Sequence, residues 1–181
     1  VFSKKAFYKL MEGAHAPEWR KACGKELDDA YTNGTYELVP ADDKAQRPLP
    51  THWVLKVKID PATGDVLKYK ARITPAGNLQ KKGDQVNGYT QSSYPVLSPV
   101  GLLYTFTYAM LVARTIISHD TRQAFTTALL DRTIYIRPPF DFHKLVDPKV
   151  ITEFRSKHGD RRFNLRLIRS VYGLCQAGYL Y

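Results

Sequence analysis

Two stretches with a strict two-residue alternation constrain the fold of this chain most. In residues 52–59 and 66–73, apolar and cationic side chains alternate, so each stretch is typical of an amphipathic β-strand. The connecting residues Asp60 to Asp65 include Pro61 and Gly64 and have strong turn chemistry. Pairing the strands gives one apolar face and one face with the cations Lys56, Lys58, Lys68, Lys70 and Arg72. The sequence therefore predicts an antiparallel hairpin with a cationic face.

The rest of the chain mixes helices and strands. Helical spacing and Pro17 predict a helix over 17–31, and Pro99 opens a second one over 99–114. Further helices are expected over about 122–130 and after 172–176. Strands are expected over 35–39, 115–119, 133–136 and, from a weak alternation, 161–168, whereas 141–160 looks polar and irregular. This order of elements predicts an α+β fold.

The charge of the chain points to a polyanionic partner. The 181 residues carry a net charge of +10, and residues 1–50 are neutral, so the excess lies in residues 51–181. A basic surface favours nucleic acid, although anionic membranes and acidic proteins attract it too. On the hairpin, phosphates would relieve the repulsion between neighbouring cations. The alternatives to phosphate binding by these cations are a solvated sheet face and a lysine-rich edge that prevents aggregation.

Length and cysteine usage set broad limits. The chain fits one domain or part of a larger one, and the absence of Met at position 1 suggests a fragment. No apolar run approaches the roughly 20 residues needed to span a membrane, so we expect no membrane partner. Cys23 and Cys175 lack the spacing of metal ligands, which favours a reducing compartment.

Asp120 is the candidate metal ligand. It follows the apolar run 115–119, and a carboxylate at the end of a buried strand can hold a divalent cation. The spacing from Asp120 to Gln123 also fits a helix N-cap with its capping-box partner. Phe125 is either the wall of a nucleotide pocket or a core residue. The histidines form no metal-binding pattern, and no glycine-rich nucleotide loop occurs.

Several strings then follow one another in a specific order. They are Glu18-Trp19-Arg20-Lys21-Ala22, residues 33–39, 53–58 and 69–72, Asp120 to Phe125, and Ser170-Val171-Tyr172-Gly173-Leu174-Cys175-Gln176-Ala177. Together they resemble the reverse transcriptase of copia-type LTR retrotransposons. The fifth string is similar to the family's Asp-Val-Lys-Thr-Ala-Phe, and the last to its Leu-Tyr-Gly-Leu-Lys-Gln-Ala.

The resemblance implies a division of the chain and a role for each site residue. Residues 1–16 would be an N-terminal segment, 17–98 a fingers region with the basic hairpin, and 99–181 a partial palm. The implied chemistry is two-metal nucleotidyl transfer with Mg²⁺ or Mn²⁺. Asp120 and the Thr121 carbonyl would bind metal, and Phe125 would exclude a ribose 2′-OH. Lys58, Lys70 and Arg72 would hold the triphosphate. Gln176 would contact the nucleotide or the template near the primer end, and Lys56 and Lys68 would contact nucleic acid.

The resemblance also implies partners and a location. The parent protein would use an RNA template, a DNA primer and dNTPs, joined to the rest of a polyprotein. It would act in the cytoplasm, in virus-like particles, with nuclear entry possible.

The sequence departs from the family in ways that favour other interpretations. The family's Tyr-x-Asp-Asp turn follows the glutamine motif, and it does not occur within the 181 residues. We therefore expect this fragment alone not to polymerise. Residues 74–76 and 177–181 also differ from the usual family strings. The alternatives are a non-catalytic nucleic-acid-binding module and a degenerate retrotransposon relic that does not fold stably.

Overall fold

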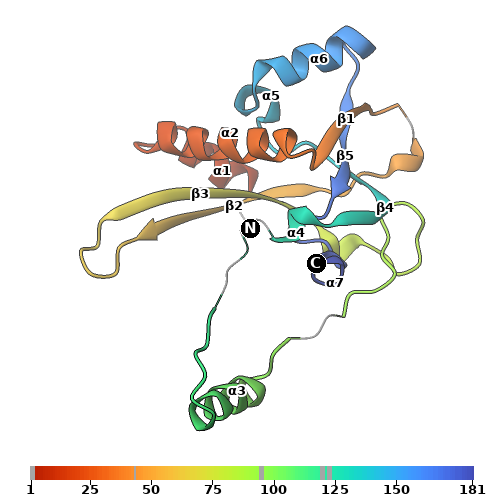
Figure 1. Cartoon of the computed structure of the whole chain (residues 1–181). Coiled ribbons are helices and arrows are strands. Elements are labelled where there is room, and N and C mark those ends of the chain that lie inside the picture. Colours follow the sequence, from red (N-terminus) through yellow and green to blue (C-terminus); the bar gives the residue numbers. More distant parts are fainter. Residues whose placement is uncertain (1–2, 43, 94–95, 119–120, 122–123) are drawn as a thin grey trace.

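The computed structural model describes residues 3–42, 44–93, 96–118, 121 and 124–181 (Figure 1). Its helices are α1 (Lys4–Met11), α2 (Ala16–Thr32), α3 (Pro99–Leu111), α4 (Ala124–Thr127), α5 (Phe142–Leu145), α6 (Pro148–His158) and α7 (Ala177–Leu180), with the 3-10 turns η1 (Lys44–Gln46) and η2 (Gly77–Leu79). Its strands are β1 (Tyr36–Pro40), β2 (Thr51–Ile59), β3 (Val66–Pro75), β4 (Leu129–Ile136) and β5 (Phe163–Arg169). Helices and strands mix along the chain, as predicted.

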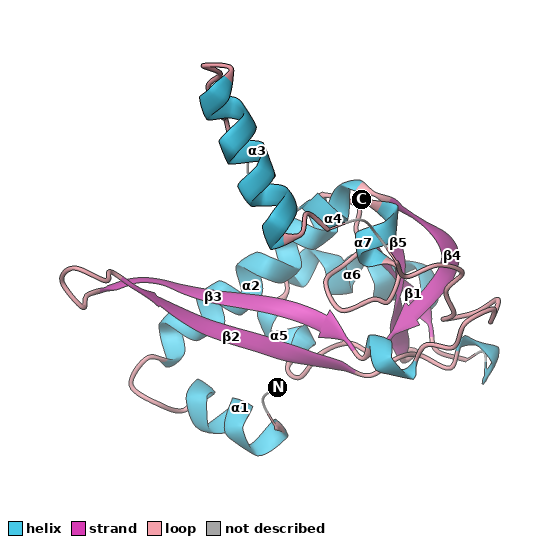
Figure 2. Cartoon of the chain, turned by 90° about the horizontal axis from the view of Figure 1, so that it is seen from below, coloured by secondary structure: helices cyan, strands magenta, loops and turns pink. Residues whose placement is uncertain are grey.

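The predicted hairpin is confirmed as the antiparallel pair β2–β3. Its register sets Lys56 opposite Lys70 and Lys58 opposite Lys68. The apolar face is buried only near the base, where Trp53 stacks on Phe7 of α1 with ring centroids 6.3 Å apart. Towards the turn the apolar side chains are exposed, because the hairpin extends past the body of the molecule (Figures 1 and 2).

A second, three-stranded antiparallel sheet has the order β1-β5-β4. Leu167 on the central strand pairs with Tyr36 on one side and with Ile134 on the other. Ile134 and Leu165 are fully buried and join the same core cluster as Leu27 of α2. The sheet thus ties together segments about 130 residues apart in sequence.

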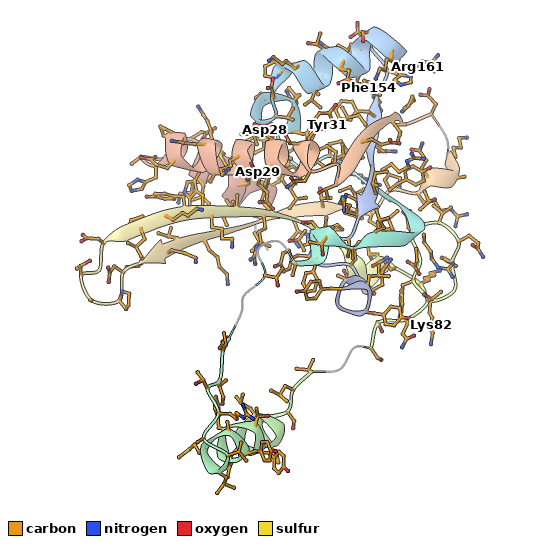
Figure 3. The ribbon with its side chains drawn as sticks, viewed as in Figure 1. Asp28, Asp29, Tyr31, Lys82, Phe154 and Arg161 are labelled. Atoms are coloured by element: carbon orange, nitrogen blue, oxygen red, sulfur yellow. The ribbon has the colours of Figure 1, made fainter. Side chains whose placement is uncertain are left out.

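Hydrogen bonds link α6 and the residue before it to α2. Tyr31 on α2 donates a hydrogen bond to Glu153 (2.9 Å), and Asp28 accepts one from the backbone N–H of Asp147 (2.8 Å). Figure 3 shows Tyr31 near Phe154 of α6, whose ring packs on Phe163 at 5.3 Å. These contacts fix α6 over the β1 end of the sheet.

Helix α3 lies apart from the body in Figure 1, and in Figure 2 it projects outward from it. It begins as predicted at Pro99, with Ser98 as N-cap accepting a hydrogen bond from the Gly101 N–H (3.0 Å). Most of its large apolar side chains are exposed, and Ala109 is its buried residue. The helix therefore leaves most of its apolar surface open to solvent.

The structure corrects several predicted elements. No strand forms over 115–118, the described part of the predicted strand 115–119, where Ile116 and Ile117 are exposed and pair with no described strand. The helix expected over 122–130 is described only as the short α4, because Leu129 already pairs with Arg169 in the sheet. Residues 141–160, expected to be irregular, contain α5 and α6.

The missed helix α6 has clear signals in the sequence. Asp147 caps it by accepting from the Lys149 N–H (2.9 Å), and Pro148 occupies its first turn. Val150 and Phe154 are spaced by one helical turn and both are buried. The N-terminal segment holds another helix, α1, whose Phe7 is fully buried.

Candidate functional site

The cationic face of the hairpin is the first part of the candidate site. Lys56, Lys58 and Lys68 are exposed, and Lys70 and Arg72 are half-buried. The pKa of Lys70 is lowered, first by partial burial and then by the charges of Arg72 and Lys58. Like charges directly opposite one another destabilise a strand pair, so an anion bound across this face would be stabilising.

Tyr172 connects this face to the segment that follows Asp120. The guanidinium carbon of Arg72 lies 4.4 Å from the centre of the Tyr172 ring, in cation–π geometry. The same ring meets Phe125 of α4 edge-on, with centroids 4.6 Å apart. Two residues predicted to bind the nucleotide, Arg72 and Phe125, are therefore brought together, although they lie 53 positions apart in the sequence.

Tyr181 contacts the other side of this cluster. Its ring is perpendicular to that of Phe125 at 6.1 Å, and its hydroxyl donates a hydrogen bond to Thr121 Oγ1 (2.9 Å). The residue next to Asp120 is thus linked to the aromatic cluster. Asp120 itself lies outside the described residues, so its predicted metal role, and that of the Thr121 carbonyl, stay predictions.

Gln176 lies inside the protein. Its side chain is fully buried, accepts a hydrogen bond from Gln80 (3.2 Å) and donates one to the Gly88 carbonyl (3.4 Å). Gln80 also accepts from the Cys175 N–H (2.8 Å). These bonds join the Gly173–Ala177 segment to the loop after β3. Nucleotide contact by Gln176 stays a prediction.

Two site residues were missed by the sequence analysis. Tyr172 stands in the quoted Tyr-Gly string, but its partners are distant in sequence and no spacing indicates them. Glu26 on α2 is the second. Its pKa is raised, first by burial and also by the charge of Asp29, although Arg72, the Ile73 N–H and Lys70 act to lower it. Glu26 therefore lies beside the same cations as a carboxylate held partly out of water.

The described residues contain no preformed cluster of metal-ligating side chains. Within them, no group of three or more His, Cys, Asp or Glu side chains is placed to hold a metal ion. Mg²⁺ prefers an octahedron of oxygen ligands, several of them carboxylates, phosphates or water. A metal at this site would need ligands beyond the described part of the chain.

Comparison with known sequences identifies the family of this chain. A family profile described as "Reverse transcriptase (RNA-dependent DNA polymerase)" matches residues 33–181, and the chain belongs to this family. The Retrovirus-related Pol polyprotein from transposon TNT 1-94 of Nicotiana tabacum is 30% identical over 159 residues, which are 87% of this chain. These matches confirm the assignment to the reverse transcriptases of copia-type retrotransposons.

The chain corresponds to a small part of its tobacco relative. The matched region is 10% of the length of that polyprotein. No solved structure matches the chain significantly. Among the described helices, none combines the length and apolar character needed to cross a membrane.

Proposed function

We propose that this chain forms part of an RNA-directed DNA polymerase within a retrotransposon polyprotein. The observation that carries the proposal is the Arg72–Tyr172–Phe125 contact, which joins a cationic hairpin to the segment that follows Asp120. A polymerase needs cations for the triphosphate close to the carboxylates that bind its metals. The family membership supports the same conclusion.

In this proposal, residues 17–98 act as the fingers and 99–181 as part of the palm. Arg72, with Lys58 and Lys70, binds the triphosphate of the incoming dNTP. Phe125, held between Tyr172 and Tyr181, presents its ring to the sugar and excludes a 2′-OH. Lys56 and Lys68 are exposed next to these residues and contact the template or primer backbone.

Asp120 and the Thr121 carbonyl would supply ligands to a divalent cation, Mg²⁺ or Mn²⁺, with the remaining ligands coming from elsewhere in the polyprotein. Such a metal supplies charge stabilisation for attack of the primer 3′-OH on the α-phosphorus and departure of pyrophosphate. The partners are then the RNA template, the DNA primer and the rest of the polyprotein, in cytoplasmic particles. The charge of +10 supports nucleic acid as the partner.

Primer extension on an RNA template tests this function. Because the 181 residues contain no Tyr-x-Asp-Asp string, the experiment uses the polyprotein region that spans this chain and that motif. Asp120→Asn should abolish Mg²⁺-dependent dNTP incorporation. Asp160→Asn, at an exposed carboxylate paired with Arg155, should leave it unchanged. Wild-type activity in Asp120→Asn would overturn the proposal.

A non-catalytic nucleic-acid-binding module is the second candidate, favoured by the exposed cations of the hairpin. It requires salt-dependent binding of an oligonucleotide by the 181-residue chain in the absence of metal and dNTP. Replacing Lys56, Lys58, Lys68 and Lys70 with Glu should abolish binding. Equal binding by that variant and the wild type would exclude the hairpin as the binding surface.

A further inference from the structure

A basic cleft lies at the other end of the hairpin from its turn. It has a volume of about 510 Å³, and its lining includes Lys44, Arg47, Arg137, Arg162 and Phe163. It adjoins the first residue of β2, since Thr51 Oγ1 donates a hydrogen bond to the Arg137 carbonyl (2.8 Å). At 3.3 Å per residue, Lys56 lies about 17 Å further along that strand. The described lining of the cleft includes none of the cations of the hairpin face and none of the rings of the aromatic cluster.

Four cations line this cleft. Lys44, Arg47, Arg137 and Arg162 are exposed, and there is no carboxylate among the described lining residues. Within the described residues none of the four makes an ion pair, whereas the neighbouring Arg161 is paired with Asp42 at 3.2 Å. The positive potential of the four cations is thus available to a bound anion.

Buried amide groups hold the cationic segments in place. Asn87 donates hydrogen bonds to the carbonyls of Gln46 (2.6 Å) and Arg47 (2.7 Å) and accepts one from the Tyr135 N–H (2.6 Å). Gln46 in turn accepts from Asn164 (2.6 Å) and donates to the Pro40 carbonyl (2.9 Å). Arg47 is held with a positive φ of 39°. Such a satisfied buried network makes a rigid frame, as a binding site requires.

The β-strands fix the two remaining cations. Arg137 donates its N–H to the Leu49 carbonyl (2.9 Å), and the Arg162 carbonyl accepts from the Ala41 N–H (2.9 Å). Hydrogen bonds to the backbone therefore hold the segments that carry Arg47, Arg137 and Arg162. Three of the four cations are arginines, whose planar guanidinium groups match phosphate oxygens in pairs.

We propose that this cleft binds the phosphate backbone of a nucleic-acid strand, as a second contact distinct from the hairpin face. The proposal rests on the proposed function for the presence of nucleic acid. The half-buried ring of Phe163 and the rings of Pro48 and Pro138 give apolar surface against which a sugar or base packs between phosphates. Free triphosphate offers the same chemistry, and the experiment separates the two sources.

The test measures binding of a labelled oligonucleotide of about 20 nucleotides to the 181-residue chain by fluorescence anisotropy over a range of salt. Arg137→Glu with Arg162→Glu should weaken binding at least about tenfold and lower the slope of log K against log salt by about one to two. The matched control, Lys9→Glu with Lys149→Glu, carries the same charge change on α1 and α6 and should stay near the wild type. Far-UV circular dichroism and thermal transitions verify that each variant folds.

Crosslinking locates the bound strand directly. An oligonucleotide with 5-bromouracil should crosslink to the peptide that contains Phe163, and the Arg137→Glu/Arg162→Glu variant should lose that crosslink. Equal affinity in the two double variants, or crosslinks confined to the hairpin, would contradict the proposal that the cleft binds a nucleic-acid strand. Either result would leave the proposed polymerase function intact. Displacement of the crosslink by low concentrations of inorganic triphosphate, with unchanged oligonucleotide affinity, would assign the cleft to free phosphates and overturn the strand proposal. Absence of any oligonucleotide binding would count against both proposals.

Discussion

Tyr172 contacts two residues of the proposed nucleotide site with a single ring. Arg72 lies over its face and Phe125 meets it edge-on. A cation–π contact of this kind contributes about 0.5–2 kcal/mol, depending on how far it is removed from water. Tyr172 would act as a positioning residue that holds the guanidinium where the triphosphate arrives.

Replacing Tyr172 with Leu in the active polyprotein region should therefore raise KM for dNTP by roughly two- to thirtyfold and change kcat less. Tyr172→Phe keeps the ring and should stay close to the wild type. Steady-state primer extension at varied dNTP measures both. If Tyr172→Phe were as impaired as Tyr172→Leu, the ring alone would not position Arg72, and the prediction would be wrong.

Glu26 makes the stability of the fold depend on pH. Burial raises the pKa of its carboxyl above the ordinary value, despite nearby Arg72 and Lys70. The folded chain therefore holds this proton more tightly than the unfolded chain does. As the pH rises through the unfolded pKa towards the raised folded pKa, the carboxylate ionises at a cost, and the free energy of unfolding falls.

Glu26→Gln removes this contribution. Urea unfolding at about pH 4 and about pH 7 should show a smaller loss of stability across that interval than the wild type shows. Glu18→Gln, at an exposed position of the same helix, is the matched control and should follow the wild type. A Glu26→Gln variant with the wild-type pH dependence would contradict the prediction.

The role of a residue could be predicted from the sequence where that role follows from a local pattern. The alternation over 52–73 predicted which hairpin residues carry the cationic face, and the register confirms it. No local pattern indicates that Tyr172 meets Arg72, because that contact spans 100 positions. Burial of Gln176 likewise depends on Gln80 and Gly88 from a distant loop.

At the scale of elements, the junction between η2 and the Gly173–Ala177 segment joins the hairpin to the C-terminal part. A Cβ built at Gly77 would overlap the carbonyl oxygen of Gly173. The thiol of Cys175 also donates to the Gly77 carbonyl (3.1 Å). The backbones approach so closely that position 77 has no room for a side chain.

Gly77→Ala should accordingly lower the free energy of unfolding by about 1–3 kcal/mol, as overpacking does. Gly13→Ala is the control, since a Cβ there meets neighbouring atoms at 3.4 Å, an ordinary contact. Urea midpoints with unchanged m-values measure the difference. Equal midpoints for the two variants would mean that the backbones at Gly77 and Gly173 can move apart without lowering the free energy of unfolding.

Helices and turns with local sequence signals were predicted well. Strands were predicted less well, because a strand forms only where another strand pairs with it. The helices at Pro17 and Pro99 and the hairpin follow from capping, spacing and turn chemistry. The apolar run 115–119 has β-strand composition, yet a strand exists only when a neighbour pairs with it, and residues 115–118 have none among the described strands. Leu129, by contrast, was expected in a helix but belongs to β4, because it pairs with Arg169 of β5.

At the scale of the whole molecule, the core and the apolar surface are unevenly distributed. The main cluster joins α1, α2 and both sheets around Phe7, Trp53 and Leu165. Helix α3 contributes little to it and exposes Val100, Leu103, Tyr104, Met110 and Leu111, each more than half accessible to solvent. Contiguous exposed apolar surface of this kind promotes association.

The purified 181-residue chain should therefore bind an apolar dye such as ANS and self-associate with rising concentration, while its core still unfolds in one cooperative thermal transition. Leu103→Lys with Met110→Lys places two cations on α3 and should reduce both dye fluorescence and the concentration-dependent mass seen in sedimentation. Leu67→Lys alters a residue of similar exposure, 62%, on the hairpin and should reduce neither. Since α3 contributes few buried side chains, the double variant should keep the wild-type melting temperature within a few degrees. If the wild-type chain stays monomeric and does not increase ANS fluorescence at any concentration, the apolar side chains of α3 are covered in solution. A chain without a cooperative transition would instead favour the unfolded-relic interpretation.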